Sequence, residues 1–108
     1  MLRLIAVVVC ITCLAGCTSA PVQEMSDARQ AIAAARGAGA TDKTSPELYA
    51  ADAAIARAEK HLEAQEYTRA RLAAMEAKHH AGAALTNAQH DSQHAEAQRG
   101  DPPPSTPQ

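Results

Sequence analysis

The 108-residue chain has ten Lys and Arg residues and twelve Asp and Glu residues, which gives a formal net charge of −2. This mixed, slightly acidic balance argues against a nucleic-acid-binding module, which needs a cationic face. Alanine, the strongest helix former, makes up 27 of the 108 residues, and Phe and Trp are absent. The composition therefore predicts one small all-α domain with few aromatic anchors for a ligand.

The N-terminal segment joins a positive charge to a short apolar run. Arg3 precedes eleven uncharged residues, 4–14. As a helix this run is about 16 Å long, too short to span a bilayer but long enough for the core of a signal peptide. The sequence Leu-Ala-Gly-Cys at residues 14–17 resembles a bacterial lipobox. The resemblance implies removal of residues 1–16 as a signal peptide and acylation of Cys17.

Acylation of Cys17 would anchor the chain firmly, because two or three acyl chains hold a protein at a membrane where one is marginal. In lipoproteins with a similar signal, Asp after the cysteine often causes inner-membrane retention. Thr18 stands there in this chain, which favours the outer membrane and a periplasm-facing domain. The alternative is ordinary signal cleavage after Ala20, which would leave Pro21 as the first residue.

The cysteine count excludes several chemistries for the mature chain. Cys10 and Cys13 lie inside the signal segment, and Cys17 would carry lipid. The mature chain would then have no thiol for a disulfide, a zinc site or nucleophilic catalysis.

Residues 17–24 are expected to form a tether and residues 25–98 the alanine-rich helical domain. The first helix should begin near Pro21 or at Ser26 and end near Arg36. A loop is expected at 37–45. Ser45 is then a good N-cap, and Pro46 and Glu47 suit the first turn of a second helix. Its apolar seam has steps of three and four. The seam residues are Leu48, Ala51, Ile55, Ala58 and Leu62.

The apolar pattern changes phase after Leu62. Continued at the same spacing, the seam would reach Gln65, Arg69, Leu72 and Glu76, which are mostly polar. This favours a turn near residues 65–67 and an antiparallel hairpin, with one long, bent or supercoiled helix as the alternative. The new seam is a candidate interaction surface for a second copy or another envelope protein. It consists of Tyr67, Ala70, Ala74, Ala77, Ala81 and Leu85.

Several short patterns together resemble the alanine-rich helical domain catalogued as domain-of-unknown-function family 4398. They lie at residues 26–32, 45–48, 58–62 and 67–74. The resemblance implies a small helical domain of a bacterial envelope protein, and it brings no catalytic residues. Glycine is usual in the family before the tyrosine, where this chain has Gln65 and Glu66. Some members carry a following OmpA-like domain that holds peptidoglycan. No such domain is seen here, so peptidoglycan binding is not carried over.

The histidines carry the second hypothesis, a periplasmic metal-binding or buffering protein. His90 and His94 are four residues apart on an expected helix, and His79 lies eleven residues earlier on nearly the same stripe. Two imidazoles at a spacing of four can share a zinc, copper or nickel ion. The alternative is a set of exposed histidines on a polar helix.

The sequence therefore predicts a non-enzymatic envelope lipoprotein with a structural or adaptor role and no cofactor. Only eleven apolar side chains larger than alanine follow Cys17. Such a thin core favours association with a partner over a rigid catalytic site. Residues 99–108, which contain four prolines, are expected to form a disordered tail.

Overall fold

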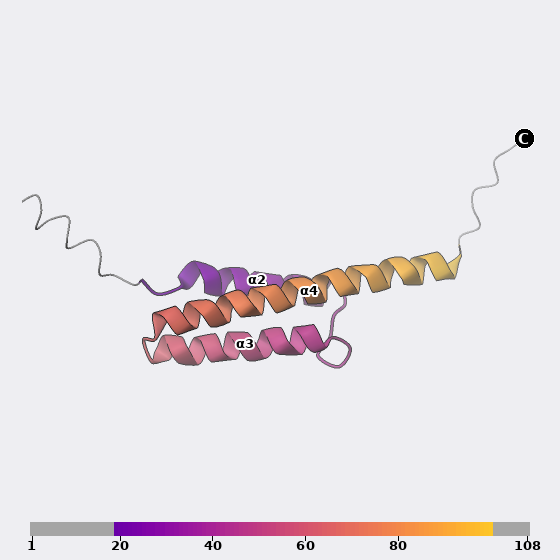
Figure 1. The fold of residues 1–108 in the computed structure, drawn as a ribbon. Coiled ribbons are helices and arrows are strands. Elements are labelled where there is room, and N and C mark those ends of the chain that lie inside the picture. The colour runs from indigo at the N-terminus through magenta and orange to yellow at the C-terminus, as the bar shows by residue number, and fades with distance from the viewer. Residues whose placement is uncertain (1–18, 101–108) are drawn as a thin grey trace, which may run out of the picture.

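The computed structural model describes residues 19–100, which form three helices. Helix α2 spans Val22–Gly37, α3 spans Pro46–Glu63 and α4 spans Tyr67–Arg99 (Figure 1). No strand occurs among these residues, and the expected all-α, three-helix architecture is confirmed. Cys17 and residues 101–108 lie outside the described range. Within residues 19–100, no helix has the length and apolarity needed to cross a membrane.

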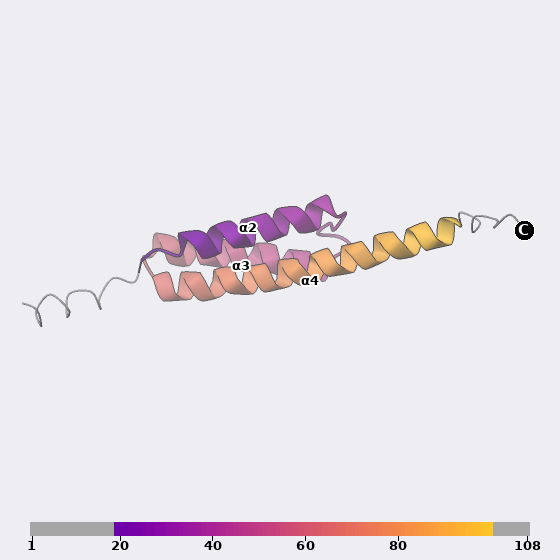
Figure 2. The same cartoon turned by 90° about the horizontal axis from the view of Figure 1, so that it is seen from above.

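Helix α4 is the longest element, and the other two helices pack along its N-terminal part. Helices α2 and α3 run antiparallel to each other, and each contacts α4 more extensively than it contacts the other (Figures 1 and 2). The 33 residues of α4 measure about 50 Å. Its C-terminal part extends beyond the loop that joins α2 to α3, and residues 89–100 are all exposed (Figure 1).

The helix boundaries follow from local chemistry. Helix α2 begins directly after Pro21, the earlier of the two expected starts, so residues 22–24 of the expected tether are helical. Ser45 caps α3 as expected, since its hydroxyl accepts a hydrogen bond from the Leu48 N–H at 3.1 Å. Pro46 occupies the first helical position, where its missing N–H costs nothing.

The phase change in the apolar pattern coincides with a tight turn between α3 and α4. Gln65 adopts a left-handed conformation with φ of 58°, and the Glu66 N–H donates to the His61 carbonyl at 2.8 Å. The hairpin is therefore confirmed, and the alternative of one continuous helix is wrong. Gln65, a non-glycine residue, takes the position with positive φ, so the chain turns here without a glycine.

The core is built mainly from alanine side chains. Small side chains let the helix backbones approach closely, and larger ones from α2 and α3, such as Ile32 and Leu48, fill the remaining space. The fully buried alanines are Ala28, Ala35, Ala51, Ala54, Ala58, Ala70, Ala74, Ala77, Ala81 and Ala84.

This burial changes the interpretation of the seam that starts at Tyr67. Four of its alanines are fully buried, and Ala74, Ala77 and Ala81 pack against α2 and α3 of the same chain. Tyr67 and Leu85, at its ends, are partly buried. The four alanines therefore hold one chain together and are not accessible to a second molecule. They are Ala70, Ala74, Ala77 and Ala81.

Ion pairs join the helices at the rim of this core. Arg71 and Lys78 of α4 bind Glu24 and Asp27 of α2 at 2.8 and 3.3 Å. On the other side of α4, Glu76 accepts from Arg57 of α3 at 3.0 Å, and α2 is joined to α3 by two further pairs. These side chains are exposed enough for water to weaken each pair.

Enlarging a central alanine should destabilise the bundle itself. Ala77→Leu adds three carbon atoms where helix packing leaves no room, and overpacking of this kind costs about 1–3 kcal/mol. Urea denaturation followed by circular dichroism measures the loss. Ala53→Leu, at an exposed position of α3, is the control and should be close to neutral. Equal stabilities of the two variants would contradict the assigned core.

The stability of the bundle should fall at acid pH. The His61 side chain lowers the pKa of Glu66 below its usual 4.5, and Arg57 does the same for Glu76. Hydrogen bonds from its own backbone and from Arg71 lower the pKa of Glu24. Because folding favours the charged carboxylates, their contribution is present above pH 4.5 and is lost as the pH falls through the lower native values.

Urea denaturation at a series of pH values measures this dependence. A variant with Gln at positions 24, 66 and 76 should have a weaker dependence on pH in the same range. An unchanged free energy of unfolding as the carboxylates of the unmodified chain become protonated would contradict the prediction.

Candidate functional site

The predicted histidine site does not come together as one centre. His79, His90 and His94 are all exposed on α4. Eleven residues separate His79 from His90, which is about 16 Å along a helix, whereas zinc ligands lie about 2 Å from the ion. Among residues 19–100, no group of three or more His, Cys, Asp or Glu side chains is placed to hold a metal. Of the three predicted histidines, only His90 and His94, four residues apart on α4, are close enough to bind one ion together.

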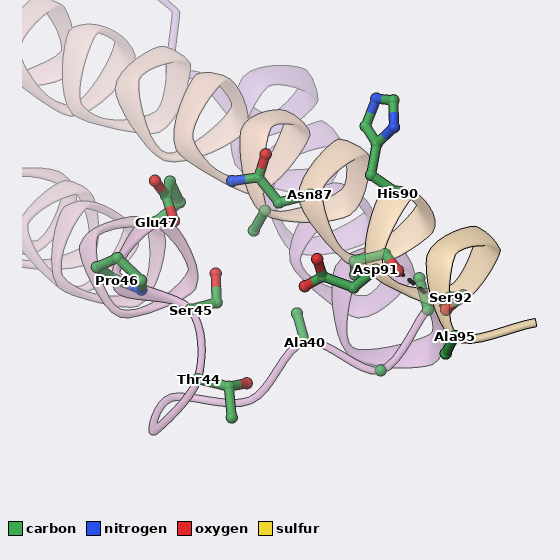
Figure 3. A pocket seen from close by; sticks show the side chains of 14 residues that line it. Ala40, Thr44, Ser45, Pro46, Glu47, Asn87, His90, Asp91, Ser92 and Ala95 are labelled. Carbon is green, nitrogen blue, oxygen red and sulfur yellow. Dashed lines mark hydrogen bonds between the residues drawn. The ribbon is translucent and has the colours of Figure 1, made fainter. Parts of the chain in front are cut away.

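An open groove lies where α4 extends past the ends of α2 and α3. It has a volume of about 740 Å³ and is bounded by the α2–α3 loop, the start of α3 and residues 84–95 of α4. In Figure 3 the Asp91 carboxylate reaches toward Ser45, while the His90 ring points away from the groove.

The polar groups around this groove do not form a catalytic arrangement. The Ser45 hydroxyl already caps α3. The charged lining residues other than His90 are Glu47 and Asp91, both acidic, so the lining has no Lys or Arg that would stabilise an anion. The groove is therefore best explained as the place where α2 and α3 stop packing against α4.

The side of α4 turned away from the core carries a second set of residues, which we call the outer face. It consists of Leu72, Met75, His79, Gly82 and Thr86. At 100° per residue, these positions point opposite the buried alanines. Leu72 and Met75 are 62% and 55% exposed, and they are two of the four large hydrophobic residues that the described chain leaves exposed.

The outer face borders a shallow groove on the α2 side. The groove has a volume of about 840 Å³ and lies between Glu24 and Asp27 of α2 and the α4 segment from Met75 to Thr86. The two exposed apolar side chains beside this groove, Leu72 and Met75, make this side of α4 a candidate surface for binding another protein.

Gly82 is the least expected residue of the outer face. It lies inside α4, where glycine costs about 1 kcal/mol relative to alanine. A Cβ atom added at this position would meet no atom within 4 Å. Packing within the chain therefore does not require glycine here, whereas close approach of a second backbone would.

The outer face does not stand out in the sequence, because the alanine pattern on the opposite side of α4 is more regular. Leu72 falls on the phase that continues the α3 seam, and Met75 falls on neither seam. Two large apolar residues three positions apart, on the side of α4 away from the alanines, were the available signal.

Comparisons with known proteins do not assign the chain to a group. No family model, no curated protein and no solved structure matches it. The resemblance to domain-of-unknown-function family 4398 stays a prediction.

The histidine pair predicts only weak metal binding. Two imidazoles on an exposed helix leave the other positions of a zinc ion to water. We expect a dissociation constant of about 1 mM or weaker for zinc, equivalent to roughly 4 kcal/mol, by isothermal titration calorimetry. His90→Ala or His94→Ala should remove this binding, and the control His79→Ala should not. Micromolar binding that is lost in both variants would instead establish the metal-binding hypothesis.

Proposed function

We propose that this chain is a lipid-anchored protein of the bacterial cell envelope with a structural or adaptor role. It is held at a membrane through Cys17 and presents helix α4 to a protein partner. The observation that carries the adaptor role is the outer face of α4, where Leu72 and Met75 remain exposed beside Gly82. The lipobox-like sequence at residues 14–17 carries the anchor.

The arrangement of the helices suits this role. The chain enters the bundle at Pro21, four residues after Cys17. Helix α4 runs from this end of the bundle to the opposite one and continues past the other helices (Figure 1). An anchor at Cys17 would therefore hold the N-terminal end of α4 near the membrane and direct its C-terminal end away from it.

The bundle also suits a passive role better than a catalytic one. Two open grooves border α4, and several of their polar side chains are already used for capping or ion pairing: Ser45 in one, and Glu24, Asp27 and Lys78 in the other. An interaction surface needs only an exposed complementary face on a rigid support, which α4 provides.

In-cell photocrosslinking tests the proposal. A photoreactive amino acid at position 75 should form adducts with protein in the envelope, because this position lies on the outer face. The matched position 53, exposed on α3, should form few. Cys17→Ser should remove the chain from the membrane fraction, or leave it as the uncleaved precursor, and reduce the adducts at position 75.

Mass spectrometry of the N-terminal peptide completes the test. An acylated peptide that begins at Cys17 is expected. An unmodified peptide that begins at Pro21 would contradict the anchor, and equal adduct formation at positions 53 and 75 would contradict the adaptor surface.

A further inference from the structure

We propose that the partner of the outer face is a second copy of this chain, bound helix to helix, parallel and in register. This inference rests on the proposed function, because it names the partner of the same surface. In such a pair, Leu72, Met75 and Gly82 of one copy would face the same residues of the other.

The spacing of the outer face matches that of paired helices. From Leu72 to Thr86 the steps are three, four, three and four residues. Their mean of about 3.5 keeps one stripe in contact with a partner helix as the two wind around each other. The large apolar side chains of the stripe are Leu72 and Met75. Beyond Thr86 the same positions are Gln89 and Gln93, and the stripe ends there.

The charges beside the outer face select the parallel orientation. The flank toward α2 carries Arg71 and Lys78, which bind acidic residues of that helix. The flank toward α3 carries Glu76, which binds Arg57. In a parallel pair, opposite flanks meet, and Arg71 of one copy comes near Glu76 of the other. In an antiparallel pair, equal flanks meet, so the basic flanks of the two copies, which carry Arg71 and Lys78, would face each other.

The existing ion pairs do not prevent this additional contact. Arg71 donates to Glu24 at 2.8 Å, and Glu76 accepts from Arg57 at 3.0 Å. A guanidinium has five N–H donors, and a carboxylate can accept about four hydrogen bonds. The two residues can therefore extend the rim network from one bundle to the next.

Gly82 gives the pair its closest contact. Two helices approach each other most closely where neither has a side chain. In the proposed pair, Gly82 would lie opposite Gly82 of the second copy. Its exposed position and the free space around it provide this access. Its helix-destabilising effect is then explained by association rather than by packing within the chain.

The size of the contact makes membrane anchoring important. The stripe from residue 72 to 86 is about 21 Å long. It contains only two large apolar side chains, Leu72 and Met75, so the contact buries little apolar area. A parallel pair has both Pro21 ends on the same side, so both anchors can enter one membrane. Confinement to that surface raises the effective concentration toward millimolar, where weak contacts are populated.

The decisive variant is Gly82→Leu in the full-length chain purified from membranes in detergent micelles. Sedimentation velocity should show a monomer–dimer equilibrium for the unmodified chain. Gly82→Leu should raise the dissociation constant by at least about tenfold. Its melting temperature at low protein concentration should be equal or higher, because leucine favours helix more than glycine does. The control Ala53→Leu should leave the equilibrium unchanged.

Photocrosslinking of the same purified chain determines the orientation. A photoreactive residue at position 72 should label the second copy near its own position 72 in a parallel pair. Labelling near position 86 would establish an antiparallel pair and overturn the proposed orientation.

Two results would overturn the self-association itself. One is a monomer at millimolar concentration in micelles, and the other is a dimer that Gly82→Leu leaves intact. If the purified chain is monomeric while position 75 still forms adducts with other envelope proteins in cells, this inference fails and the proposed adaptor role stands. If neither association occurs, both fail.

Discussion

Close packing of alanine side chains along α4 is the constraint on which the rest of the structure depends. Ten alanines are fully buried, and they come from all three helices. Each contributes little apolar area, so the bundle gains stability from close backbone approach and many small contacts. Larger side chains such as Met25, Ile32 and Leu48 complete the core beside these alanines.

This packing also determines which surfaces remain for other molecules. Helices α2 and α3 both pack against the alanine side of α4. Leu72 and Met75 lie on the opposite side of that helix and therefore remain exposed. Ion pairs on both flanks join α4 to its neighbours, and α4 contributes the basic partners toward α2 and the acidic partner toward α3. The same contacts that stabilise one chain therefore give the outer face a defined direction.

The connections between helices decide where the bundle ends. Ser45 starts α3 through its side-chain cap, and Gln65 reverses the chain through a left-handed conformation. Helix α3 has 18 residues and α4 has 33, so α4 has no partner within the chain for its last turns. This part is polar on all sides and holds His90 and His94, which explains both its exposure and the absence of a closed metal site among the described residues.

The sequence by itself determined the helical class, the cap at Ser45 and the turn after α3, because these depend on local propensity and on the phase of apolar residues along one chain. It also showed that the alanines from Ala70 to Ala81 form an interface. Only the tertiary structure decided that this interface lies inside one chain. A helix face has the same residue pattern whether it packs against a helix of its own chain or against another molecule. The outer face became visible only when α2 and α3 had been placed, since exposure depends on which other helices cover a residue.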